Sequence, residues 1–179
     1  MSISVCVIGD SHVGRIALHG ETIRRSLGPR VSVSFRYRGG SGFNFIRESM
    51  GSLWEYDIVL VFTGGNDLKP GLDCEAAASS ASSLLLELGT RGLVAYLPVW
   101  PRHRHRYPEF SAAYDRMRRE FEEALVSCCG SAIRFWEWGY RRMRVHHALE
   151  EGDRVHLSSL GYSRAAKDLV CLINKLVKQ

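Results

Sequence analysis

Two short motifs near opposite ends of the chain contain the three residue types of an acyl-transfer triad. Gly9-Asp10-Ser11-His12 follows the first apolar run, and Asp153-Arg154-Val155-His156 precedes the last helical segment. A serine hydroxyl is a poor nucleophile until a base takes its proton, and a carboxylate orients that base. Because Asp153 and His156 are close in sequence, one turn of chain can present both to Ser11. The motifs predict that Ser11 attacks, His156 takes the proton and Asp153 orients the imidazole.

The elements that must position these residues alternate between strands and helices. Apolar runs rich in branched and aromatic residues predict buried strands, and helical patterns lie between them. This alternation favours parallel strands joined by right-handed crossovers, so we expect an α/β sandwich of helices around a mostly parallel five-stranded sheet. The predicted strands are 3–8, 31–37, 57–62, 93–97 and 132–138, and the predicted helices are 13–26, 43–53, 74–88, 109–127 and 158–177.

Polar motifs follow the predicted strands at the edge where ligands bind in an open parallel sheet. Gly9-Asp10-Ser11 follows the first strand, a glycine-rich turn at 39–42 follows the second, and Thr63-Gly64-Gly65-Asn66-Asp67 follows the third. The 153–156 motif lies just before the last helix, whose N-terminus is predicted to be capped by Ser158 or Ser159. We expect all four motifs to face one crevice.

Composition favours one ordinary soluble domain. The 179 residues are 45% hydrophobic and 24% charged, so we expect a single domain over 1–179 and an intracellular, soluble protein. The five cysteines form no C-x-x-C pair, which predicts reduced and mostly buried thiols. The histidines show no zinc-binding spacing, so we expect neither metal nor cofactor.

A formal net charge of +5 and a pI near 9.1 are compatible with an RNA or anionic membrane partner. Much of the excess lies in basic runs at 102–106 and 141–144, for which a solvated surface is the alternative interpretation. Trp136 and Trp138, on an expected edge strand, fit either a homodimer interface or the core.

The four motifs, in order, resemble the sequence blocks of the SGNH (GDSL-type) hydrolase superfamily. The resemblance runs from residue 9 to residue 156 and implies a flavodoxin-like three-layer sandwich and a serine esterase without a metal. It implies that the backbone amides of Ser11 and Gly42 and the side-chain amide of Asn66 form the oxyanion hole, with Ser11, His156 and Asp153 as the triad. Such donors stabilise the negative charge of a tetrahedral intermediate.

The chain departs from the commonest pattern of that family at two positions. His12 stands where the best-known members have leucine, and Phe43 stands where many have aspartate; we expect both to line the site. Gly40 is the alternative to Gly42 if the turn has another register. Trp100 is expected, together with Arg102, to shape the pocket from the loop after the fourth strand.

A second resemblance, carried by residues 9–15 and 64–68, is to SGNH domains of animal retroelement-derived proteins, including the esterase domain of some non-LTR retrotransposons. It implies one module of a longer protein. The leading hypothesis is an esterase that cleaves short acyl groups, acetyl first. The alternatives are a lysophospholipase or thioesterase with the same residues, or an inactive fold that binds nucleic acid or protein. Each motif also has a structural interpretation, as a helix cap, a tight turn or a surface histidine.

Overall fold

A five-stranded sheet with the order β2-β1-β3-β4-β5 forms the centre of the molecule. The computed structural model describes residues 2–101, 108–136 and 155–178. All four strand pairs are parallel, so the expected sheet and its flavodoxin-like order are confirmed. The strands are β1 (Ile3–Gly9), β2 (Val31–Tyr37), β3 (Ile58–Phe62), β4 (Leu93–Tyr96) and β5 (Arg134–Phe135).

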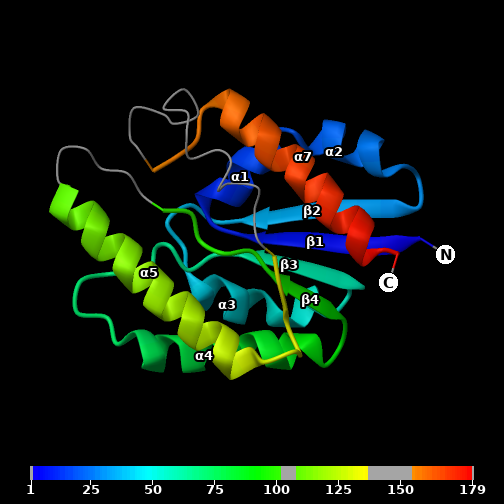
Figure 1. The fold of residues 1–179 in the computed structure, drawn as a ribbon. Helices are drawn as coiled ribbons and strands as arrows, with labels where there is room; N and C mark the ends of the chain where they lie inside the picture. The colour runs from blue at the N-terminus through cyan, green and yellow to red at the C-terminus, as the bar shows by residue number, and fades with distance from the viewer. Residues whose placement is uncertain (1, 102–107, 137–154, 179) are drawn as a thin grey trace.

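Helices cover both faces of this sheet (Figure 1). One face carries α1 (Ser11–Ala17), α2 (Gly20–Leu27) and α7 (Ser159–Leu176), and the other carries α3 (Phe43–Leu53), α4 (Cys74–Gly89) and α5 (Pro108–Cys129). Strand β1 shows why two cores form, because successive side chains of a strand point to opposite faces. Val5 and Val7 join the core under α7, whereas Cys6 and Ile8 join the core over α3 and α4.

The helix expected over 13–26 is interrupted. Helix α1 ends at Ala17 and α2 begins at Gly20, with Leu18 84% exposed between them. A Cβ on Gly20 would lie 3.3 Å from the Phe35 ring in β2. The start of α2 therefore comes close to the sheet at a glycine. Apolar periodicity in the sequence does not indicate this contact. The other helices begin and end within a few residues of the predicted bounds, and Ser158 caps α7 by accepting a hydrogen bond from the Gly161 amide.

The expected fifth strand is shorter than predicted among the described residues. Strand β5 covers Arg134–Phe135, and the Trp136 amide adds one further hydrogen bond to the Tyr96 carbonyl at 3.1 Å. Trp136 is half-buried and packs on the Lys175 ammonium, and Trp138 lies outside the described residues.

All five cysteines are thiols, as expected, but they are less buried than predicted. Cys6 and Cys129 are buried, and burial raises their pKa values to about 12 and about 11. Cys128 and Cys171 are exposed because they face outward from α5 and α7, and Cys74 is half-buried. No helix in the described part of the chain has both the length and the apolar character needed to cross a membrane.

Candidate active site

Ser11 and His156 are brought into contact at the carboxyl edge of the sheet. The Ser11 Oγ lies 2.9 Å from the His156 Nε2, although the residues are 145 positions apart in the chain. Ser11 is the first residue of α1, and His156 is half-buried just before α7. This is the geometry in which an imidazole can take the proton of a serine hydroxyl. Asp153, the expected third member, lies outside the described residues.

The buried carboxylate of Asp10 fixes the start of α1. Asp10 is 4% exposed and accepts a hydrogen bond from the His12 amide at 2.9 Å, so it caps the helix. The cap holds Ser11 at the first helical position, where a backbone N–H has no acceptor within the helix. The Ser11 amide is thus in the position expected of an oxyanion donor.

Asn66 connects the loop after β3 to two neighbouring segments. Its Nδ2 donates a hydrogen bond to the Ser41 carbonyl at 2.9 Å and lies 3.5 Å from the Asp10 Oδ2. Asn66 therefore lies between the glycine turn and the start of α1. Residues of three of the four predicted motifs therefore meet here, and His156 of the fourth contacts Ser11.

Gly42 lies directly against the carboxylate of Asp67. A Cβ at this position would overlap that carboxylate, so only glycine fits. The Asp67 Oδ2 also accepts a hydrogen bond from the Phe43 amide at 3.1 Å, and burial raises the pKa of Asp67. Gly40, by contrast, has a φ of +71° and open space around it, as a turn glycine does. The packed position at the start of α3 is therefore Gly42, and Gly40 shapes the turn that leads to it.

Two buried tyrosines hold the loop that carries Asn66. The Tyr96 hydroxyl donates to the Thr63 carbonyl at 2.9 Å, and the Tyr114 hydroxyl donates to the Gly65 carbonyl at 3.3 Å. Tyr96 comes from β4 and Tyr114 from α5, so the loop is anchored from two other elements. Neither tyrosine is near the loop in sequence, and no motif marks them.

Aromatic side chains surround His12 beside His156. The His12 ring is 5.1 Å from the His156 ring, 4.9 Å from Trp100 and 5.6 Å from Phe62, measured between centroids. The expectation that His12 and Trp100 lie at the site agrees with this placement. The Tyr162 hydroxyl lies 2.8 Å from the His12 Nδ1. Tyr162 was not proposed as a site residue from the sequence.

The Phe43 ring does not line the site as expected. It is 8% exposed, stacks on Tyr96 and contacts Phe121 in a tilted arrangement in the core beneath α3 and α5, because the first turn of α3 directs it to the sheet. Only its backbone amide reaches the site, through Asp67. Arg102 and the basic runs at 102–106 and 141–144 lie outside the described residues.

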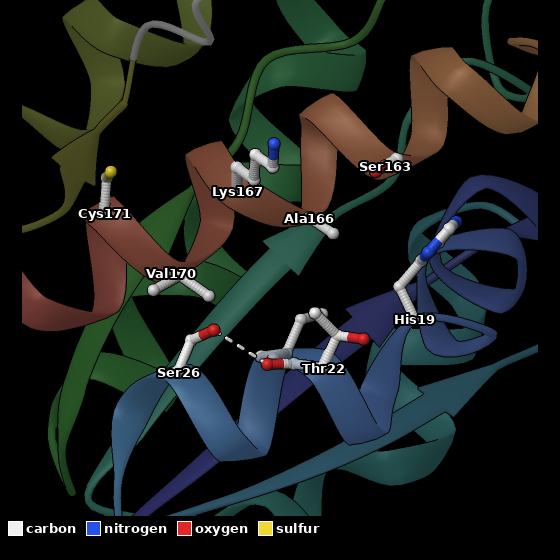
Figure 2. Close-up of a pocket in the computed structure, with 9 residues that line it drawn as sticks. His19, Thr22, Ser26, Ser163, Ala166, Lys167, Val170 and Cys171 are labelled. Atoms are coloured by element: carbon white, nitrogen blue, oxygen red, sulfur yellow. Dashed lines mark hydrogen bonds between the residues drawn. The ribbon is translucent and has the colours of Figure 1, made fainter.

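A separate groove of about 270 Å³ runs between α2 and α7 (Figure 2). Ile23, Ala166 and Val170 give it an apolar lining, and in Figure 2 Thr22 and Ser26 lie along its α2 side. Neither Ser11 nor His156 lines it. The groove is therefore distinct from the site at the sheet edge.

Comparison with solved structures identifies the fold. A lipase/acylhydrolase from Enterococcus faecalis superposes with a TM-score of 0.74 at 17% identity, covering 96% of this chain and 95% of that one. A member of the lipolytic G-D-S-L family from Veillonella parvula gives 0.70 at 15% identity, covering 94% and 97%. An acetylxylan esterase from Geobacillus stearothermophilus gives 0.66 at 16% identity, covering 94% and 92%.

The chain has the SGNH hydrolase fold. The resemblance drawn from the four motifs is thus confirmed at the level of the fold. No family model and no curated protein sequence matches the chain.

Proposed function

We propose that this SGNH-fold protein is a serine esterase that hydrolyses short-chain acyl esters, acetyl esters first, through an acyl-Ser11 intermediate. The observation that carries the proposal is the 2.9 Å contact between the Ser11 Oγ and the His156 Nε2. A serine and a histidine in contact at the ligand-binding edge of a parallel sheet form a nucleophile and its general base.

In the proposed reaction, the Ser11 Oγ attacks the ester carbonyl carbon while its proton moves to the His156 Nε2. The carbonyl oxygen becomes an oxyanion, the C–O bond to the alcohol then breaks, and the alcohol leaves with the proton from His156. Water deprotonated by His156 attacks the acyl-Ser11 ester, the C–O bond to the Ser11 Oγ breaks, the Oγ takes the proton back from His156, and the acid leaves. Asp153 is assigned to orient the imidazole, as the Asp-x-x-His spacing indicates.

The oxyanion is assigned to the amides of Ser11 and Gly42 and to the Asn66 Nδ2. Asn66 already uses one hydrogen on the Ser41 carbonyl at 2.9 Å, and its second contact, to Asp10, is the longer one at 3.5 Å. The second hydrogen is the one that an oxyanion would take over. Each such donor contributes about 10²- to 10³-fold in rate.

Solved structures that share the fold support the proposed esterase activity. They include an acetylxylan esterase, and a serine-to-alanine variant of that enzyme is a catalytic mutant. A lysophospholipase or thioesterase would use the same residues with a longer acyl chain or a thioester. We propose further that residues 1–179 form a single SGNH hydrolase-like domain.

Hydrolysis of p-nitrophenyl esters from acetyl to octanoyl tests the proposal. We expect turnover that is highest for the acetyl ester. A preference for octanoyl would favour the lipase-like alternative. No turnover of any ester by a folded protein would contradict the esterase and direct the next test to RNA binding at varied salt.

A further inference from the structure

A buried hydrogen bond joins α1, which begins at Ser11, to α7, which follows His156. The His12 Nδ1 lies 2.8 Å from the Tyr162 hydroxyl, across 150 residues of sequence. His12 is adjacent to Ser11 in α1, and Tyr162 lies in the first turn of α7, where its amide donates to the Ser158 carbonyl at 3.0 Å. The bond therefore connects the two chain segments that carry the reacting atoms.

Burial makes this bond hard to replace. His12 is 8% exposed and lies against the Phe62 and Trp100 side chains, and Tyr162 is 3% exposed and lies against Trp100. Water has little access to either polar atom, so removing one of them costs a buried hydrogen bond. Each group thus holds the other in one orientation.

The His156 ring packs beside the same His12 ring. The two ring centroids lie 5.1 Å apart at an interplanar angle of 51°, so His12 packs directly against the base. A displacement of about 1 Å between reacting groups can cost about 100-fold in rate. A side chain that touches the base and is itself fixed by α7 is therefore suited to hold the Ser11–His156 contact.

We propose that His12 and Tyr162 are positioning residues that keep the His156 base at contact distance from Ser11. This inference rests on the proposed esterase function. Neither side chain is assigned a proton transfer or a contact with the oxyanion. Their effect is exerted through the placement of α1 and the 155–158 segment.

Three substitutions separate this role from simple packing. Tyr162→Phe removes only the hydroxyl, and His12→Leu removes the polar atoms of the ring. His12→Asn keeps a polar atom near the place of Nδ1, and its amide can be turned to donate or to accept. The matched control is Ser82→Ala, which removes another buried hydroxyl. Ser82 is 5% exposed, and its hydroxyl donates a hydrogen bond to the Ser79 carbonyl within α4.

Steady-state hydrolysis of p-nitrophenyl acetate, with a thermal unfolding midpoint for each variant, is the test. We expect Tyr162→Phe and His12→Leu to lower kcat about 10- to 100-fold with KM within about threefold. Acylation and deacylation both use His156, so kcat and kcat/KM fall together. His12→Asn should stay within about threefold of wild type, and Ser82→Ala should keep the wild-type kcat.

The double variant His12→Leu/Tyr162→Phe should be no slower than the slower single variant, because both remove the same bond. Wild-type kcat in Tyr162→Phe, or equal losses in His12→Asn and His12→Leu, would overturn the positioning role. If Tyr162→Phe does not fold, the comparison of His12→Asn with His12→Leu still tests the positioning role. Labelling of Ser11 by a fluorophosphonate separates the two claims: wild-type protein that neither labels nor hydrolyses esters overturns the esterase, and this inference with it.

Discussion

Glu122 is a buried carboxyl that should make stability fall as the pH rises. It lies in α5 with its side chain 18% exposed, and one oxygen accepts a hydrogen bond from the Arg118 Nη1 at 2.7 Å. The other oxygen, Oε1, is buried. Burial raises the pKa of Glu122 from 4.5 to about 7, against the opposing effects of Arg118 and of a hydrogen bond from the Val99 amide.

The sign follows from which form the fold prefers. The folded protein binds the proton of Glu122 more tightly than the unfolded chain does, so the protonated form contributes stability. That contribution is complete below about pH 4.5 and is lost as the pH rises through about 7. The difference between these two pKa values corresponds to about 3 kcal/mol, at about 1.4 kcal/mol for each pH unit.

Glu122→Gln keeps the shape of the side chain and removes its ionisation, so the variant should lack this loss. Urea unfolding at about pH 4.5, 6, 7 and 8, followed by tryptophan fluorescence, measures the free energy of unfolding of each protein. The free energy of unfolding of Glu122→Gln minus that of wild type should rise by about 3 kcal/mol from the lowest pH to the highest. In thermal unfolding this corresponds to roughly 6–12 °C.

The neighbouring Glu123→Gln is the matched control, because Glu123 is exposed on the same helix. Its difference from wild type should change with pH by much less than that of Glu122→Gln, because an exposed side chain stays in water when the chain folds. A Glu122→Gln difference that stays constant within about 1 kcal/mol over this range would refute the reasoning.

Four further substitutions test the site and the core. Asn66→Ala removes a proposed oxyanion donor and should lower kcat about 100- to 1,000-fold in ester hydrolysis; a wild-type kcat would contradict its role. Gly42→Ala places a methyl group on the Asp67 carboxylate and should lower both kcat and the unfolding midpoint. Gly40→Ala should cost about 1 kcal/mol of stability through its positive φ and leave kcat unchanged, so equal activity losses would contradict the assignment of Gly42. Leu85→Ala, at a fully buried position in α4, should lower the free energy of unfolding by about 2–5 kcal/mol in urea titration, and a loss below 1 kcal/mol would contradict its place in the core.

The fold was predictable because its signals are local. Branched apolar runs such as Ile58–Phe62 are buried on both faces of the sheet, and the turns between elements carry glycine, proline and aspartate. The break between α1 and α2 was not predicted from the sequence; Gly20, which begins α2, approaches Phe35 in β2 closely. The apolar spacing of Val13, Ile16 and Ile23 continues across the break and conceals it.

The site was predictable only where its residues fall in motifs. Ser11, Asn66 and His156 follow strands or precede a helix, so topology places them together. The choice of Gly42 over Gly40 depends on the Asp67 carboxylate, which packs against it from another loop. Tyr162 has no motif at all, since its partner His12 is 150 residues away.

The most direct test of the esterase is hydrolysis of p-nitrophenyl acetate by wild-type protein and by Ser11→Ala, with folding of both verified by circular dichroism. Ser11→Ala leaves the His156 imidazole and the proposed oxyanion donors in place and removes only the nucleophile. We predict measurable wild-type turnover and a loss of at least about 1,000-fold in the variant. A Ser11→Ala protein that retains more than about a tenth of the wild-type rate would contradict the acyl-Ser11 mechanism.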